Sequence, residues 1–163
     1  MALSIKPYIE NKERIHLIGI GGVSMNSLAE LLLSKGVPVS GSDRLRTDVT
    51  ARLEALGAAI TYEHRPENVE GASLIVRTAA VHDENPEIVR AHELGIPVME
   101  RAEAWGHIMR DYDNVVCLSG THGKTTSTSM MTMIDHRGAD GPDGHGRQQP
   151  AAIGGTLRIG GKG

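Results

Sequence analysis

The sequence has few aromatic residues. The 163-residue chain contains no Phe, one Trp and three Tyr, and the aromatic share is 2%. Because the hydrophobic share is still 39%, a packed core is possible, but it must be aliphatic. The length suits one domain of ordinary size together with the beginning of another.

Further absences restrict the compartment and the partners. A single cysteine, Cys117, cannot form an internal disulfide, which fits a reducing compartment. No apolar stretch approaches the length of a membrane span, and the first residues contain no apolar run of signal-peptide length. The net charge of -3, with both signs interspersed, leaves no basic surface for nucleic acid. We therefore expect a soluble cytoplasmic protein that binds neither nucleic acid nor a membrane.

Short apolar runs alternate with helical patterns along the chain. The runs predict strands at 15–20, 37–41, 59–61, 73–78, 96–99 and 114–119, and the 3.6-residue periodicity predicts helices at 24–35, 48–56, 85–94 and 100–109. In the second helix Val49, Leu53 and Leu56 are predicted to face inward. This alternation predicts an α/β fold with a Rossmann-like parallel sheet and helices on both faces.

A first glycine-rich loop joins the first strand to the first helix. Gly19, Gly21 and Gly22 would let the backbone approach a pyrophosphate at the helix N-terminus, and Ser24 could cap that helix or donate its hydroxyl to a phosphate. Asp43 ends the second strand, where ribose recognition is expected in such folds. The alternative is a tight turn without a ligand, in which Asp43 caps the next turn.

A second glycine-rich loop follows the strand 114–119. Its Gly-Lys-Thr sequence matches the end of a phosphate-binding loop, although Leu118 stands where the standard pattern has its first glycine. Backbone N–H groups could cradle phosphates, Lys124 could reach the β/γ oxygens, and the Thr125 hydroxyl could bind Mg²⁺.

Two phosphate loops imply two phosphate ligands. An NAD(P)-dependent oxidoreductase or other NAD(P)-binding Rossmann module would explain only the first loop, and an ordinary NTPase only the second. A ligase that activates a nucleotide-linked substrate with ATP explains both.

The chain resembles the Mur ligase family over about 14–134. The segments that carry the resemblance are HLIGIGGVSM (16–25), VSGSD (39–43), TAAVHDENPE (78–87), ELGIPVMERAE (93–103) and SGTHGKTT (119–126). The resemblance implies an ATP- and Mg²⁺-dependent ligase of peptidoglycan precursor synthesis that joins L-alanine to UDP-N-acetylmuramate through an acyl phosphate. A related ligase that recycles a tripeptide onto the same sugar nucleotide is the alternative, but it typically has Cys at the position of Gly21.

The resemblance also implies roles for individual residues. The UDP-sugar would be bound by Gly19, Gly21, Gly22, Ser24, Ser42, Asp43, Thr78, Ala79 and Ala80. ATP would be bound by Gly120, Thr121, Gly123, Lys124, Thr125 and Thr126, with Thr125 on the metal and with His122 and Lys124 in catalysis. The L-alanine site would lie outside this chain, which alone would bind UDP-sugar without activity. We assign no role to His64 or His82.

These inferences divide the chain into a UDP-sugar-binding domain at 1–113, the first strand, P-loop and helix of an ATPase domain at 114–134, and an atypical tail at 135–163. The tail holds nine of the 20 glycines and is expected to be irregular. Residues 135–150, back-translated with GC-rich codons and read one nucleotide later, give a peptide that resembles the family. We therefore interpret 135–150 as a frameshifted stretch, with a divergent or inserted surface segment as the alternative.

Overall fold

The computed structural model describes residues 3–111 and Thr121. The predicted strand 114–119, the rest of the second glycine loop, the helix after it and the tail 135–163 lie outside the described residues, as does the boundary at 113.

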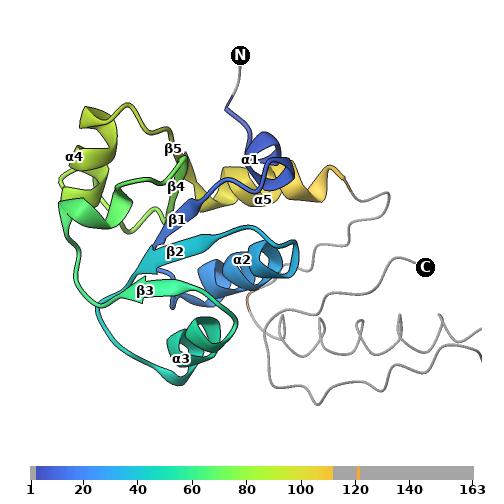
Figure 1. Ribbon diagram of the computed structural model, residues 1–163, viewed down its shortest axis with the longest axis horizontal. Helices are drawn as coiled ribbons and strands as arrows, with labels where there is room; N and C mark the ends of the chain where they lie inside the picture. Colours follow the sequence, from blue (N-terminus) through green and yellow to red (C-terminus); the bar gives the residue numbers. More distant parts are fainter. Residues whose placement is uncertain (1–2, 112–120, 122–163) are drawn as a thin grey trace, which may run out of the picture. The chain divides into compact units, whose positions relative to one another are not determined.

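A parallel five-stranded sheet organises the described residues (Figure 1). Its strands are β1 (Ile15–Ile18), β2 (Val39–Ser42), β3 (Ala59–Thr61), β4 (Leu74–Arg77) and β5 (Val98–Glu100). The helices are α1 (Lys6–Glu10), α2 (Val23–Ser34), α3 (Asp48–Ala55), α4 (Pro86–Glu93) and α5 (Arg101–Met109), with the 3-10 helix η1 (Pro66–Val69).

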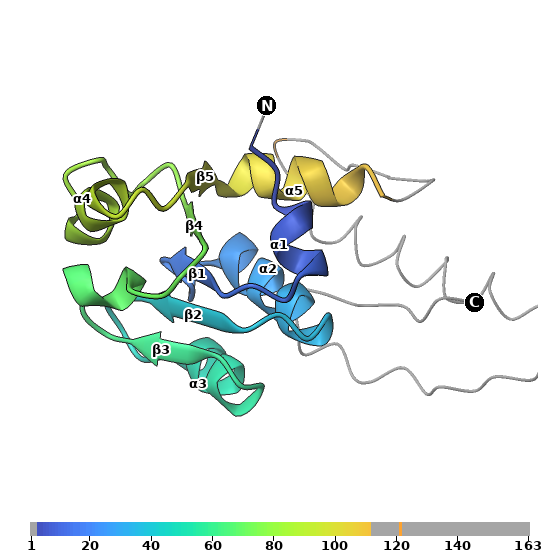
Figure 2. The ribbon, with the colours of Figure 1, turned by 45° about the horizontal axis from the view of Figure 1, so that its top comes forward.

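The strand order is β3-β2-β1-β4-β5, with β1 in the centre. From β1 the chain adds β2 and β3 on one side, and then crosses to add β4 and β5 on the other side (Figure 2). The order therefore reverses between β1 and β4. In open α/β sheets, ligands bind beside such a reversal, outside the carboxyl ends of the strands.

Successive residues of the central strand face two separate hydrophobic cores, as the pleat of a strand requires. Leu17 belongs to the larger core, which includes Leu28 of α2 and Ile108 of α5. Ile18 belongs to the smaller core, which includes Ile88 of α4. The sheet is therefore covered on both faces: α2, α3 and α5 contribute to one core, and η1 and α4 to the other.

Local sequence explains where the helices begin. The Thr47 side chain accepts a hydrogen bond from the Thr50 N–H, and the Thr50 hydroxyl accepts one from the Thr47 N–H, which forms a capping box at α3. At α4, the Asn85 side chain accepts from the Glu87 N–H, and Pro86 takes the first helical position, where no N–H is needed. This second cap holds the backbone of Glu87 in the first turn of α4.

The parallel sheet with helices on both faces is confirmed. Each predicted strand and helix that falls within the described residues is present, with ends shifted by no more than two residues. The prediction that Leu56 faces inward is wrong: α3 ends at Ala55, and Leu56 is 54% exposed as the chain leaves the helix. The short α1 and η1 were missed, because five and four residues are too few for a periodic pattern.

Candidate functional site

The first glycine loop begins directly at the carboxyl end of β1. Gly19 has φ +79°, a left-handed conformation that favours glycine, and it turns the chain toward α2. The N–H groups of Gly19 and Ile20 both donate to the Ser42 carbonyl, at 2.8 and 3.1 Å. The loop is thereby attached to the carboxyl end of β2.

Asp43 lies against this loop. Its Oδ2 accepts a hydrogen bond from the Gly21 N–H at 2.8 Å, and its Oδ1 accepts one from the Arg44 N–H at 2.7 Å. A Cβ on Gly21 would lie 2.8 Å from Asp43 Oδ2, closer than real Cβ atoms come to other atoms. Glycine at position 21 therefore lets the acid and the loop backbone meet, and Asp43 also organises the turn that follows it.

The segment after β4 borders the loop on its other side. A Cβ on Gly19 would lie 3.9 Å from the Thr78 Cγ2 atom, so the two segments are in van der Waals range. Arg77 holds the segment in a turn, because its guanidinium donates to the Val81 carbonyl at 3.2 Å and pairs with Asp83. Thr78 is half-buried, whereas Ala79 and Ala80 are exposed.

The start of α2 faces the same edge without a side-chain cap. Gly22 is the N-cap residue, and the first intrahelical bonds run from the Met25 and Asn26 N–H groups to its carbonyl. Helix N-termini favour anions because their first N–H groups have no partner within the helix. Ser24, in the first turn, is half-buried, and its carbonyl accepts from Trp105 Nε1 at 3.3 Å. A tight glycine loop, a helix start and a neighbouring carboxylate are together suited to a phosphorylated nucleoside.

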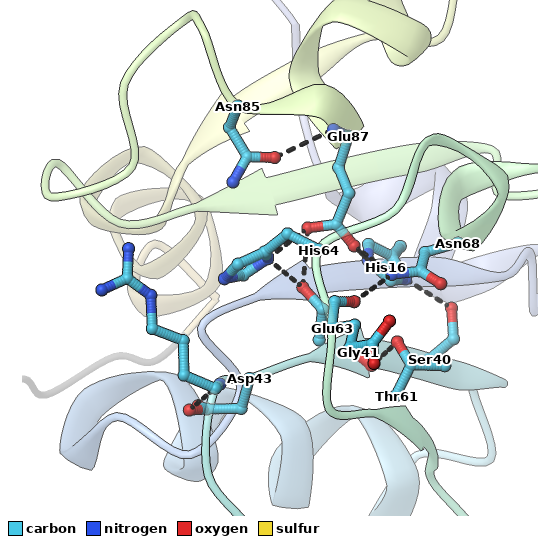
Figure 3. Close-up of polar contacts among 12 residues, drawn as sticks. His16, Ser40, Gly41, Asp43, Thr61, Glu63, His64, Asn68, Asn85 and Glu87 are labelled. Atoms are coloured by element: carbon cyan, nitrogen blue, oxygen red, sulfur yellow. Dashed lines mark hydrogen bonds and ion pairs between the residues drawn. The ribbon is translucent and has the colours of Figure 1, made fainter.

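A buried polar cluster, which sequence analysis missed, lies beside this edge (Figure 3). Its centre is Glu87 of α4, whose side chain is completely buried. Its carboxylate interacts with four side chains: His16 Nε2 (3.2 Å), Ser42 Oγ (2.7 Å), His64 Nδ1 (2.7 Å) and Asn68 Nδ2 (2.7 Å). We call His16, Ser40, Ser42, His64, Asn68 and Glu87 the Glu87 cluster; Ser40 belongs to it through a 3.0 Å contact with His16 Nδ1.

The cluster keeps Glu87 ionised. Burial alone raises the pKa of the Glu87 carboxyl, but hydrogen bonds from His16, Asn68, His64 and Ser42 outweigh it, so the net pKa is lowered. The position of Glu87 in the first turn of α4 also favours a negative charge.

The predicted UDP-sugar residues all lie in the loops after β1, β2 and β4 or at the adjoining ends of β2 and α2. Ser42 differs from the others because its side chain is fully buried and its hydroxyl donates to Glu87. His64, to which we assigned no role, belongs to the Glu87 cluster. One signal could have been recognised: His16 interrupts an apolar strand, and a buried polar side chain needs a partner.

The ATP-site residues lie outside the described residues apart from Thr121, which is exposed. Within the part of the chain that the structure describes, no group of three or more His, Cys, Asp or Glu side chains could hold a metal ion. No helix among residues 3–111 is long and apolar enough to cross a membrane.

The model of the "Mur ligase family, catalytic domain" matches residues 14–113, more than half of the chain. The chain belongs to the Mur ligase family. The UDP-N-acetylmuramate–L-alanine ligase of Acetivibrio thermocellus is 48% identical over 148 residues, which are 91% of this chain and 32% of the relative. The enzyme of the same name from Clostridium novyi is 50% identical over 125 residues, 77% of this chain and 27% of the relative.

Solved structures of the Mur ligase family resemble this chain as well. The UDP-N-acetylmuramate–alanine ligase of Thermotoga maritima matches with a TM-score of 0.74 and 35% identity, over 78% of this chain and 30% of that one. The murein peptide ligase of Psychrobacter arcticus matches with a TM-score of 0.73 and 28% identity, over 78% of this chain and 27% of that one. This chain thus spans about a third of the length of the curated relatives it matches.

Proposed function

We propose that this chain is the UDP-sugar-binding part of a cytoplasmic ligase that joins L-alanine to UDP-N-acetylmuramate. The observation that carries the proposal is the contact between the glycine loop and Asp43, at the carboxyl edge of a sheet that belongs to a Mur ligase. The identity of 48% to a ligase with this activity supports the choice of substrate.

In the proposed site, three segments of the chain contact three different parts of the ligand. Gly19, Gly21, Gly22 and Ser24 would bind the pyrophosphate, since their backbone surrounds the uncapped start of α2. Ser42 and Asp43 would form the uridine side, with the Asp43 carboxylate accepting from a ribose hydroxyl. Thr78, Ala79 and Ala80 would border the sugar, on the opposite side of the loop.

The ATP half of the proposal rests on sequence. Gly120, Thr121, Gly123 and Thr126 would supply backbone or hydroxyl groups to the phosphates of ATP, and Lys124 would neutralise charge on the transferred phosphoryl group. A threonine hydroxyl is a hard oxygen ligand, so Thr125 fits Mg²⁺, which when bound supplies further positive charge at the phosphates. His122 would lie where the two substrates meet.

Activation by ATP solves a chemical problem of amide formation. A carboxylate is a poor acyl donor until one of its oxygens becomes a good leaving group. Attack of the substrate carboxylate on the γ-phosphate of ATP gives an acyl phosphate and releases ADP. The L-alanine amine then displaces phosphate and loses a proton, which forms the amide. Since this chain spans about a third of its relatives, we propose that it binds UDP-sugar alone without forming the amide.

Titration calorimetry of the purified chain with UDP-N-acetylmuramate, NADH and ATP with Mg²⁺ tests this proposal. We expect binding of UDP-N-acetylmuramate and no binding of NADH. UDP should also bind, and UMP should bind less tightly because it lacks the second phosphate at the glycine loop. Tight binding of NADH without a response to UDP ligands would show that the chain is an NAD(P)-binding module.

The tripeptide-recycling ligase is the second candidate, and the likeness to the murein peptide ligase favours it. Both ligases would use the same sugar nucleotide, so the calorimetry does not separate them. A full-length relative that carries these segments separates them by the amine it accepts. We expect L-alanine rather than a tripeptide, because glycine stands at position 21.

A further inference from the structure

The Glu87 carboxylate is saturated with hydrogen-bond donors. Its Oε1 lies 3.2 Å from His16 Nε2 and 2.7 Å from Asn68 Nδ2, and its Oε2 lies 2.7 Å from both Ser42 Oγ and His64 Nδ1. An ionised carboxylate accepts about four hydrogen bonds. The donors come from β1, β2, η1 and the segment after β3, so one side chain of α4 joins four other segments.

These hydrogen bonds determine which ring nitrogen of each histidine carries a hydrogen toward Glu87. An ionised carboxylate only accepts hydrogen bonds, so His16 Nε2 and His64 Nδ1 must both carry hydrogen. His16 is enclosed, since it is 1% exposed and its Nδ1 contacts the Ser40 hydroxyl at 3.0 Å. The ring of His16 therefore has both nitrogens engaged inside the protein.

His64 is in a different position. It follows the carboxyl end of β3, its side chain is 21% exposed, and its Nδ1 also lies 3.2 Å from the hydroxyl of Ser42, the residue before Asp43. Among residues 3–111 its Nε2 has no hydrogen-bond partner. Glu87 thus holds the ring with Nδ1 toward the cluster and leaves Nε2 for another partner.

We propose that Glu87 is a positioning residue that holds His64 with Nδ1 toward the carboxylate and with Nε2 available to the nucleoside of the bound sugar nucleotide. This inference rests on the proposed function. With hydrogen on Nδ1, the Nε2 atom of an uncharged imidazole accepts from N–H or O–H groups, and a nucleoside offers both in its hydroxyls and its base. Fully ionised phosphates have no hydrogen to donate, so the nucleoside and not the pyrophosphate matches His64.

Nitrogen-15 NMR of the histidine rings in the full chain without ligand tests the positioning directly. In the wild-type chain we expect the Nδ1–H form of His64, assigned by loss of its signals in His64→Asn. The Asn68 NH₂ group donates to both Glu87 and the Glu63 carbonyl, so in Glu87→Gln the carboxamide oxygen should face Asn68 and His16. The carboxamide NH₂ group then faces Ser42 and His64, and the His64 signals should shift toward the Nε2–H form. An Nε2–H ring in the wild type, or an unchanged ring in a folded Glu87→Gln variant, would overturn the inference.

A second variant keeps the test decisive if Glu87→Gln does not fold. His64→Asn retains a donor near the place of Nδ1 for Glu87 but has no atom at the place of Nε2. We expect it to fold as the wild type does and to bind UDP-N-acetylmuramate about tenfold more weakly, the usual scale of one lost hydrogen bond. Binding of inorganic pyrophosphate should not change.

His92→Asn is the matched control, because His92 is exposed at the other end of α4 and makes no contact with the cluster. It should bind UDP-N-acetylmuramate as the wild type does. Equal affinity of His64→Asn and His92→Asn would overturn the ligand contact. If the wild-type chain binds no UDP-sugar at all, the proposed function fails, and the NMR result alone decides whether Glu87 positions His64.

Discussion

Gly21 shows how one missing side chain lets two segments of the chain meet. Its N–H donates to Asp43 at 2.8 Å, and no side chain of its own keeps the two segments apart. At the residue scale, the candidate site depends on close contacts of this kind, which single substitutions can test.

Gly21→Ala should weaken binding of UDP-N-acetylmuramate by about tenfold or more, on the scale of one lost hydrogen bond. The added Cβ would lie 2.8 Å from Asp43 Oδ2 and 3.1 Å from Thr50 Cγ2, so Asp43 must move. Calorimetry measures the change. Gly106→Ala is the control: a Cβ there meets nothing within 4 Å, and affinity should stay the same. An unchanged affinity in Gly21→Ala would remove the Asp43 contact from the proposed site.

Glu87 should make the free energy of unfolding depend on pH in the acid range. The pKa of Glu87 is lowered below its ordinary value of 4.5, so the unfolded chain takes up the proton first as pH falls. The stabilisation is therefore fully present above about pH 4.5 and is lost as pH falls through the folded-state pKa.

Urea unfolding of the wild type and Glu87→Gln between pH 7 and pH 3 measures this effect. At pH 7 the variant should be less stable by about 2–4 kcal/mol, because buried donors lose their acceptor. The difference should shrink at acid pH. A difference that stays constant across this range would mean that the charge of Glu87 contributes nothing.

At the scale of elements, the contact between β2 and the glycine loop is equally tight. A Cβ on Gly41 would lie 2.7 Å from Ile20 Cδ1 and 2.8 Å from the Leu17 carbonyl oxygen, which belongs to the paired strand β1. Backbone in the middle of a sheet cannot shift as a flexible side chain can.

Gly41→Ala should therefore lower the free energy of unfolding by about 1–3 kcal/mol, the usual cost of overpacking. Thermal or urea unfolding measures it. Gly106→Ala, within α5, should instead raise the free energy by up to about 1 kcal/mol, because alanine favours a helix interior. Similar behaviour of the two variants would contradict the packing described for β2.

The sequence predicted most of the elements because each carries its own periodic signal. The run at 15–20 and the apolar face of 24–35 located β1 and α2, and the glycines between them located the loop. The Glu87 cluster had no such signal. An acidic residue in the first turn of a helix usually faces solvent. Glu87 is buried because α4 packs against η1 and β5, and because side chains of β1, β2 and η1 enclose its carboxylate. For the same reason the internal hydrogen bond of Ser42 was not foreseen.

At the scale of the whole molecule, the chain corresponds to about a third of the length of its relatives, and the second glycine loop is known from its sequence alone.

Lys124→Ala in a full-length relative should abolish turnover while UDP-sugar binding stays nearly intact, because the change removes charge from phosphoryl transfer and not from the first domain. Phosphate release and calorimetry measure the two properties. Lys35→Ala, an exposed position after α2, is the control. Normal turnover of Lys124→Ala would show that its role is misassigned.

The gene offers a separate test of residues 135–150. If this stretch is frameshifted, its codons should give a ligase-like peptide in the next reading frame, flanked by two compensating single-nucleotide changes. Sequencing of the gene decides the matter. Codons without a sensible ligase-like reading in that frame would leave local divergence or insertion as the explanation.

The Glu87 cluster also has a consequence for the order in which the protein folds. The partners of Glu87 lie 19, 23, 45 and 71 positions away in the chain, so none of them is a local neighbour. The chain must therefore bring β1, β2, η1 and α4 together before the Glu87 carboxylate can be buried with all of its hydrogen bonds formed. We expect contacts of such long range to form after the folding transition state and to break before it on unfolding. Their strength would then set how slowly the native protein unfolds rather than how quickly it forms.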